Sequence, residues 1–257
     1  MGKLGVRSSK IEPCIWFKHM QVCKYCKGIK SERHDCCEQH KAKGEHDCLE
    51  WTLLIVVQFV DDALIAGCRA VKQWFIDNIK KHLTIEHSEG CNGFLGVDIV
   101  QDVSKGRVEI LIHDLIEQAV QRFKTYCDGV HPKNIPAPAS AKFTKASDEE
   151  HAIAKELPYQ KLVGVLIFIA GWCKIECQTI VSMLGQHMHC WSKAHFSAAI
   201  RALMYCYGTR HRGICFHRGS SNGVKINELW SMSDADLAGD ESTRHSRTGK
   251  IVMLNGG

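Results

Sequence analysis

The stretch Thr52-Leu-Leu-Ile-Val-Val-Gln-Phe-Val60-Asp61-Asp62-Ala63-Leu-Ile-Ala66 sets two apolar runs on either side of a pair of aspartates. β-branched and aromatic residues dominate the first run, which is typical of a strand. Two such runs around a two-residue polar step predict a β-hairpin with Asp61-Asp62 at its turn, although Asp-Asp favours a turn less than Asn-Gly does. A hairpin tip holds adjacent carboxylates in solvent, and carboxylate oxygens suit Mg²⁺. The alternative is a solvated turn that happens to contain two aspartates.

Similar patterns continue along the chain. Apolar residues recur with helical spacing in four segments, 71–83, 113–126, 159–172 and 194–207, with a helical or irregular piece at 180–188. Strand-like runs are predicted at 14–17, 94–100, 108–112, 228–232 and 250–254, and a short hairpin at 213–230. A Pro-rich connector at 132–138 is the predicted domain boundary. Antiparallel hairpins mixed with helices favour the α+β class.

Composition restricts the class of protein. The chain has 257 residues, of which 45% are hydrophobic, which is enough for a real core. Its net charge of +5 is compatible with nucleic acid without being diagnostic. The polar segment 1–10 is not a secretory signal, and the longest apolar run, 163–173, is too short to span a bilayer. We therefore expect an intracellular protein (cytoplasm or nucleus) with reduced thiols and no membrane partner.

Residues 21–50 differ sharply from the rest, because they are rich in Lys, Glu, His and Cys and nearly empty of large aliphatic side chains. Such a segment buries little apolar surface by itself. A Cys-x2-Cys pair and a later Cys-x2-His pair offer thiolate and imidazole ligands that suit a tetrahedral Zn²⁺ site, namely Cys23, Cys26, Cys37 and His40. The alternative is a Cys-rich insertion that binds no metal, since the spacing matches no familiar zinc module.

Phe59-Val60-Asp61-Asp62 resembles the Tyr/Phe-Val-Asp-Asp box of copia-type (Ty1/copia) retrotransposon reverse transcriptases. Other boxes similar to those of the family follow in the same order across residues 1–20 and 51–257. They are Leu4-Gly5-Val6, Glu12-Pro13-Cys14, Phe94–Ile99, Tyr159–Gly164, His195 with Ala198-Ala199, Tyr207-Gly208-Thr209 and Ser233–Asp240. Each box alone is weak, so it is the shared order that carries the resemblance.

The resemblance implies a part of a Pol polyprotein that acts as an RNA-directed DNA polymerase by two-metal nucleotidyl transfer. It implies a partial palm at 1–130 with the insertion at 21–50, helices of a thumb and connection at 131–220, and a truncated RNase H-like segment at 221–257. Asp61 would bind Mg²⁺ or Mn²⁺ directly, Asp62 would support it, and Phe59 and Val60 would lie near the primer end. Asp234 would be the first metal-binding aspartate of the RNase H domain. The implied partner is an RNA or DNA template-primer.

The match to the family has gaps. The family's third palm aspartate would precede Met1, and the later RNase H carboxylates would follow Gly257, so we expect little polymerase or ribonuclease activity from this chain alone. Leu237 stands where the family has Trp, and the segments Cys173–Cys177 and Cys190-Trp191 lack prolines that are usual there. The alternatives are a non-catalytic remnant that binds nucleic acid or zinc, and a decayed reading frame without function.

Three further features have competing explanations. Trp74 and Phe75 lie on a helical apolar stripe, which predicts core positions rather than a surface for base stacking. The basic group formed by Arg210-His211-Arg212, His217 and Arg218 is either a contact for a nucleic-acid backbone or a charged, solvated edge. The histidines His187, His189 and His195 suggest a metal site, but we expect a structural role for His195 on its predicted helix.

Overall fold

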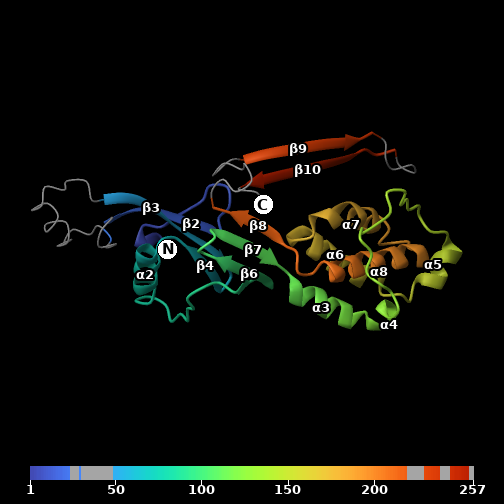
Figure 1. Cartoon of the computed structure of the whole chain (residues 1–257), viewed down its shortest axis with the longest axis horizontal. Coiled ribbons are helices and arrows are strands. Elements are labelled where there is room, and N and C mark those ends of the chain that lie inside the picture. The colour runs from blue at the N-terminus through green and yellow to red at the C-terminus, as the bar shows by residue number, and fades with distance from the viewer. Residues whose placement is uncertain (24–28, 30–48, 219–228, 238–243, 255–257) are drawn as a thin grey trace, which may run out of the picture. The chain divides into compact units, whose positions relative to one another are not determined.

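The computed structural model describes residues 1–23, 29, 49–218, 229–237 and 244–254. Helices and antiparallel strands are mixed along the chain (Figure 1), which confirms the predicted α+β class. The chain forms two compact units, Met1–Glu89 and Gly90–Gly257. None of the helices in the described ranges combines the length and apolar composition that crossing a bilayer requires.

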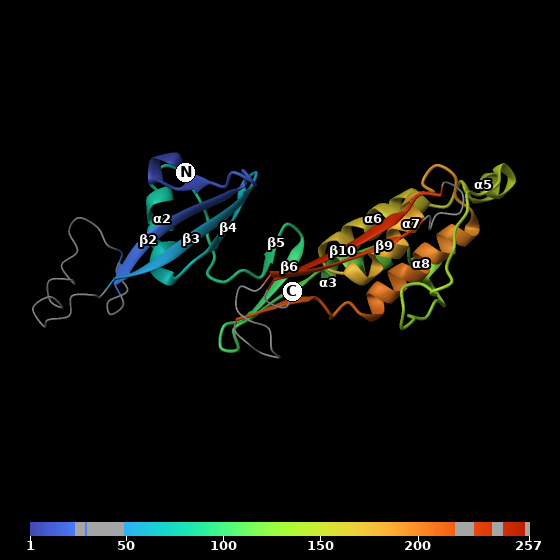
Figure 2. The same ribbon diagram turned by 90° about the horizontal axis from the view of Figure 1, so that it is seen from above.

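The first unit is a four-stranded antiparallel sheet with a helix on it. The strands lie in the order β1 (Arg7–Ser8), β2 (Ile15–Cys23), β3 (Leu49–Phe59) and β4 (Asp62–Ala66). A short 3-10 helix, η1 (Gly2–Leu4), precedes the sheet. The helix α2 (Arg69–Ile79) follows β4 and runs along one face of the sheet (Figure 2).

The core of this unit forms where alternate residues of β3 meet one stripe of α2. Leu54 and Val56 of β3 are fully buried, together with Val71 and Phe75 of α2. Trp74 packs against the same cluster, so the predicted core positions of Trp74 and Phe75 are confirmed. The helix ends at Ile79, four residues before the predicted end.

The second unit contains a sheet, a group of helices and a separate ribbon. The sheet has the order β5 (Gly93–Phe94), β6 (Val97–Asp102), β7 (Arg107–Leu111) and β8 (Ile214–His217). The helical elements are α3 (His113–Arg122), α4 (Lys124–Cys127), α5 (Asp148–Ala154), α6 (Tyr159–Trp172), η2 (Ile175–Cys177), α7 (Gln178–Gly185) and α8 (Lys193–Gly208). The strands β9 (Leu229–Asp236) and β10 (Arg247–Leu254) form an antiparallel two-stranded ribbon.

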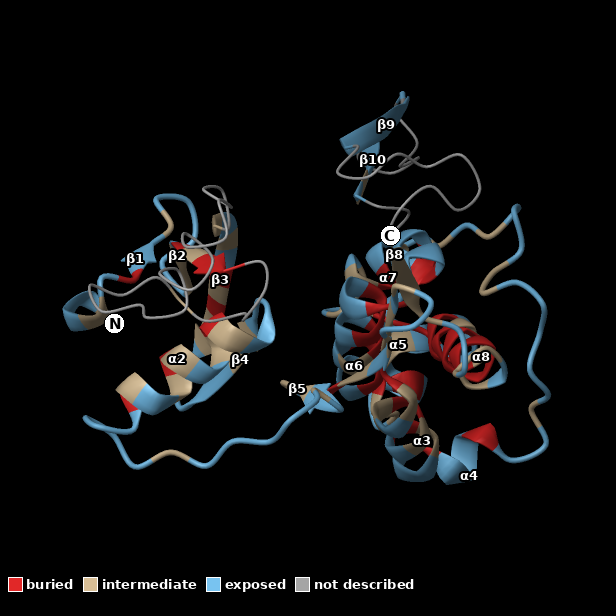
Figure 3. Ribbon diagram, turned by 60° about the vertical axis from the view of Figure 1, so that its left-hand side comes forward, coloured by how far each residue is buried: buried red, intermediate tan, exposed pale blue. Residues whose placement is uncertain are grey.

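One hydrophobic core joins the helices of this unit. Its buried residues face inward where α6, α7 and α8 meet (Figure 3). Ile116 and Phe123, which precede the Pro-rich connector, share this core with Leu166 of α6 and Leu203 of α8. Side chains on both sides of the Pro-rich connector therefore pack together, and the two compact units divide at Glu89. The domain assignment with a boundary at residue 131 stays a prediction.

Two predicted elements are corrected by the structure. The segment 213–230 does not pair as a local hairpin in its described part, because Ile214 of β8 pairs with Ile110 at the free edge of β7. Residues 219–228 of that prediction lie outside the described residues. The helix predicted at 113–126 divides at Phe123, where φ is −104° and ψ is 22°. The first difference depends on pairing between segments that are distant in sequence.

Candidate functional site: the β3–β4 turn

A two-residue turn joins β3 to β4 and carries the candidate carboxylates. The strands are antiparallel, and their last pair is Phe59 with Asp62. The loop residues are therefore Val60 and Asp61, whereas Asp62 is the first residue of β4. The predicted hairpin is confirmed, but the turn lies one residue earlier than Asp61-Asp62, because the register pairs Ala63 with Gln58 rather than with Val60.

The backbone at this turn adopts an unusual conformation. Val60 has φ of 53°, a value that L-residues seldom adopt and β-branched residues least of all. The Gln58 side chain donates a hydrogen bond to the Val60 carbonyl at 3.4 Å. Since such strain persists only where the surrounding structure fixes it, the paired strands hold the position of the tip.

Both carboxylates stand in solvent. Asp61 and Asp62 are exposed, as are Phe59 and Val60. Within the described part of the chain, neither aspartate forms an ion pair. Their oxygens are therefore available to a cation from solvent.

The turn after β1 lies beside this tip. The backbone N–H of Gln58 donates to the carbonyl of Cys14 at 2.8 Å, which extends the pairing of β2 with β3 toward the tip. The backbone N–H of Cys14 in turn donates to the Glu12 carboxylate at 3.1 Å. A hydrogen bond between the Cys14 thiol itself and the Glu12 carboxylate raises the pKa of the thiol. A third acidic residue, which the sequence analysis did not single out as a site residue, thus lies at the same end of the sheet.

Asp61 and Asp62 are ligands of the type that Mg²⁺ prefers, but two side chains are too few for a complete metal site. Carboxylate oxygens are its preferred protein ligands. Among the described residues, however, no group of three or more His, Cys, Asp or Glu side chains is arranged to hold a metal ion. Asp61 and Asp62 therefore form part of a metal site at most.

Asp234 lies in the second unit. It is an exposed residue of β9, and its Cα pairs with that of Gly249 in β10. Its Oδ1 accepts a hydrogen bond from the backbone N–H of Ala235 at 2.9 Å. No described carboxylate joins it in a metal-binding group.

The predicted zinc ligands are described only in part. Cys23 is the last residue of β2, where its Cα pairs with that of Leu49 and its side chain is buried. Cys26, Cys37 and His40 lie outside the described residues. The zinc site remains a prediction.

Arg210, in the basic group, is held by neighbouring side chains. Its Nε donates to Glu117 of α3 at 3.1 Å, and its guanidinium carbon lies 4.3 Å from the centre of the Tyr207 ring. The rings of His113 and His211 are in contact close by, with centroids 4.8 Å apart. These contacts fasten the end of α8 to α3, so Arg210 has a structural role whether or not nucleic acid binds.

His195 is structural, as expected. Its side chain is 3% exposed, and its Nδ1 accepts a hydrogen bond from the backbone N–H of Ser192 at 3.1 Å. Burial lowers the pKa of His195 to about 4, with a smaller contribution from His187. The imidazole is therefore neutral at pH 7 and caps the first turn of α8.

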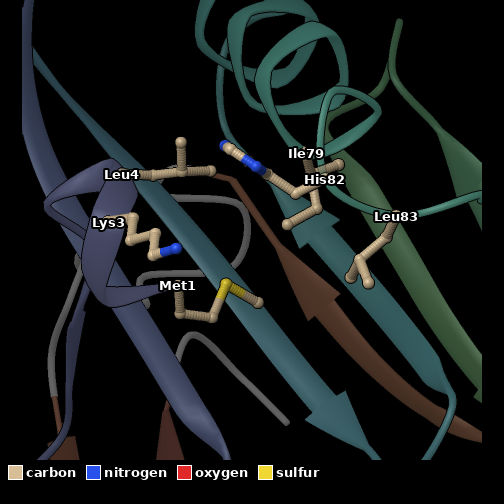
Figure 4. A pocket seen from close by; sticks show the side chains of 6 residues that line it. All are labelled: Met1, Lys3, Leu4, Ile79, His82 and Leu83. Atoms are coloured by element: carbon tan, nitrogen blue, oxygen red, sulfur yellow. The ribbon is translucent and has the colours of Figure 1, made fainter.

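One pocket of the first unit was not foreseen. It has a volume of about 350 Å³ and lies between η1 and the end of α2 (Figure 4). Its lining is mostly apolar, with two basic groups, and consists of Met1, Lys3, Leu4, Ile79, His82 and Leu83. Because no carboxylate lines it, the pocket offers nothing to the metal chemistry considered above.

Known proteins are similar to this chain in sequence, although none of them belongs to a family whose model matches it. No protein-family model matches the chain, and no solved structure is significantly similar to it. The "Retrovirus-related Pol polyprotein from transposon TNT 1-94" of Nicotiana tabacum is 25% identical over 87% of this chain. The "Putative transposon Ty5-1 protein YCL074W" of Saccharomyces cerevisiae is 26% identical over 98% of this chain and 77% of its own length.

A third relative matches a shorter stretch. The "Secreted RxLR effector protein 161" of Plasmopara viticola is 31% identical over 40% of this chain and 69% of its own length. The chain spans only 16% of the tobacco polyprotein. The two relatives that cover most of this chain are both transposon proteins.

Proposed function

Because this chain is a homologue of retrotransposon Pol polyproteins, we propose that it is the part of such a polyprotein that contributes the Asp-Asp hairpin of an RNA-directed DNA polymerase. The observation that carries the proposal is the β3–β4 tip, where Asp61 and Asp62 stand exposed on a two-residue turn. The position of the Phe59–Asp62 box in the series of copia-type boxes along the sequence supports the same assignment.

Asp61 is the proposed direct ligand of a divalent cation, and Asp62 the neighbouring carboxylate. A bound Mg²⁺ or Mn²⁺ would neutralise charge on the phosphates of an incoming nucleotide. The protein's own contribution is positional, since paired strands hold both carboxylates at a strained turn. Among the described residues no third metal-binding side chain joins these two carboxylates, so we expect no robust primer extension by this chain alone.

Titration with Mn²⁺, followed by proton relaxation of water, tests the metal proposal on the full chain. Asp61→Asn should weaken binding at least tenfold, which corresponds to about 1.4 kcal/mol. Glu12→Gln is the matched control, because Glu12 is an exposed acid at the same end of the sheet; it should change binding less than twofold. Equal Mn²⁺ affinity in the wild type and in the Asp61→Asn/Asp62→Asn double variant would refute the assignment.

The proposed partner is a template-primer nucleic acid. The net charge of +5 favours such a polyanion. One exposed side of α6 adds a surface for it, because Ile167, Phe168 and Trp172 are exposed and a Cβ added at Gly164 or Gly171 would meet nothing. The Phe168 and Trp172 rings lie 6.0 Å apart, and exposed aromatic rings of this kind lie against bases and sugars.

Fluorescence anisotropy with a labelled primer-template that carries a single-stranded template overhang tests this partner. We expect affinity to fall as salt rises, and Phe168→Ala to weaken binding by about tenfold, in line with about 1–3 kcal/mol per stacked base. Ile153→Ala removes another exposed apolar side chain, from α5, and serves as the control. Affinity that is independent of salt, or equal loss in both variants, would argue against the proposed surface.

A further inference from the structure

A pair of thiols lies where two helical elements of the second unit meet. Cys177 ends η2, and Cys206 belongs to the last turn of α8. Their sulfur atoms are 3.6 Å apart, although the residues are separated by 29 positions in sequence. Both side chains are fully buried. Neither residue belongs to the carboxylate site or to the proposed nucleic-acid surface.

Contacts on both sides of the pair hold the two elements in register. On one side, the Lys174 ammonium donates to the carbonyl of Thr209 at 2.6 Å. On the other, the hydroxyl of Tyr205 donates to the Glu176 carboxylate at 3.2 Å. Because these contacts flank the thiols, neither sulfur moves far from the other while η2 stays docked on α8.

We propose that Cys177 and Cys206 form a redox-sensitive site, which closes to a disulfide when the protein meets hydrogen peroxide and thereby fastens η2 to α8. A disulfide has its sulfurs about 2.05 Å apart, so the two sulfurs, now 3.6 Å apart, must approach by about 1.5 Å. The inference does not depend on the proposed polymerase function.

The chemistry balances with peroxide as the oxidant. One thiolate attacks a peroxide oxygen, so that an S–O bond forms, the O–O bond breaks and the leaving hydroxide takes a proton to become water. The second thiol then attacks the sulfenic sulfur, the S–S bond forms and a second water leaves. Two thiols are oxidised by two electrons, and one peroxide is reduced to two waters.

The surroundings make the reaction slow in the closed fold. The hydrogen bond between the two thiols, and then burial, raise the pKa of Cys206 well above its ordinary value, so little thiolate is present near pH 7. Lys174 opposes this shift and Glu176 adds to it. Oxidation of Cys177 and Cys206 should therefore be slower than oxidation of the exposed Cys68. Its rate should depend on how often η2 briefly moves away from α8.

Peptide mapping tests the pair on the full chain. The reduced protein is treated with hydrogen peroxide, blocked with N-ethylmaleimide and digested with trypsin. Cleavage after Lys174, Lys193, Arg201 and Arg210 places Cys177 in one peptide and Cys206 in another. We expect these two peptides to be linked and to separate on reduction. A Cys190→Ala background removes the one other cysteine of the first peptide. Linkage of Cys206 to Cys173 instead, or oxidation of Cys68 to completion with no linked peptide, would overturn the proposal.

Thermal unfolding supplies a second measurement. Closing a loop of this length should raise the unfolding temperature of the peroxide-treated protein by about 5–10 °C relative to the reduced protein. The rise should disappear in Cys177→Ala and in Cys206→Ala. An equal rise in either variant would assign the effect to other thiols and overturn the proposal.

Discussion

At the scale of single residues, the buried side chain of Lys174 stabilises the turn that follows α8. Its side chain is 1% exposed, and its ammonium donates to the carbonyls of Thr209 and Arg212 at 2.6 and 2.7 Å. These carbonyls belong to the turn that leads from α8 into β8. The ammonium thus bridges two carbonyls of this turn and fixes the path of the chain after α8.

Replacing Lys174 should destabilise the second unit. Lys174→Met keeps the length of the side chain but removes both donated bonds, so we expect the free energy of unfolding to fall by about 2–3 kcal/mol. Lys174→Arg keeps a cation and should cost about 1 kcal/mol or less. Urea unfolding followed by tryptophan fluorescence measures both values. Equal losses in the two variants would mean that packing rather than charge matters here.

His195 makes stability depend on pH. Its pKa of about 4 in the folded protein lies below the ordinary value of about 6.5 expected in the unfolded chain. As pH falls, the unfolded chain therefore takes up this proton first, so the stabilisation is complete above pH 6.5 and is lost between pH 6.5 and pH 4.

His195→Gln isolates this contribution, because Gln at the same position can still accept the hydrogen bond from Ser192. Chemical unfolding at several pH values should show a stability curve for the variant that is shallower by up to about 1.4 kcal/mol per pH unit within that window. Parallel curves for the wild type and the variant would contradict the expected role of His195.

Val60 stores strain at the candidate site. Its φ of 53° suits glycine better than valine, and its side chain is 79% exposed, so little burial would be lost on truncation. Val60→Gly should raise the free energy of unfolding by up to about 1 kcal/mol, while Val60→Ala should gain less because it keeps a Cβ. A thermal unfolding scan of each variant is the measurement. Destabilisation by Val60→Gly would show that the turn is unstrained.

At the scale of elements, β8 reaches the edge of β7 only through a close backbone approach. A Cβ added at Gly213 would overlap the carbonyl of Ile110, so glycine is required where β8 begins. This contact joins the end of the helical chain segment to the sheet that precedes it. A residue remote in sequence therefore controls how the sheet is completed.

Gly213→Ala should lower the free energy of unfolding by more than about 2 kcal/mol, because the backbone of β7 or β8 must move. Gly164→Ala is the matched control, since a Cβ there meets nothing and alanine favours a helix interior by about 0.5–1 kcal/mol. Urea titration should therefore show changes of opposite sign. A neutral Gly213→Ala would mean that β8 does not dock on β7 in solution.

At the scale of the whole molecule, each unit has its own hydrophobic core. One core lies within residues 6–79 and the other within residues 97–206. The segment between the two cores follows α2 and begins with the exposed residues Lys80 and Lys81. None of the buried residues described for either core belongs to this segment.

Residues 90–257, produced alone, should therefore keep the fold of the second unit. We expect their helical circular dichroism to match that of the second unit in the full chain, and their free energy of unfolding in urea to match that of the corresponding transition within about 0.5 kcal/mol. Loss of cooperative unfolding in the shorter chain would show that the second unit depends on the first.

The sequence alone was sufficient to predict those helices and strands in which regularly spaced apolar residues form one buried face. The runs around Asp61 predicted β3 and β4, and helical spacing predicted α2, α6 and α8 to within a few residues. It also predicted a hairpin around two adjacent aspartates, of which Asp61 lies in the turn and Asp62 begins β4, while their role as a metal site stays a prediction. The helix α5 was missed, although Ser147 and Glu150 form the capping box that marks its start.

Tertiary structure decided whatever depends on two distant segments meeting. It set the β3–β4 turn at Val60-Asp61, paired β8 with β7, brought Glu12 to the end of the sheet that holds Asp61, and set Cys177 against Cys206. The physical reason is that periodicity fixes which face of an element is buried but not its partner. Strand edges and buried polar groups obtain partners only once the helices have packed. The sequence alone therefore determined the helices, the strands and the pair of adjacent aspartates. The tertiary structure determined which segments lie next to them.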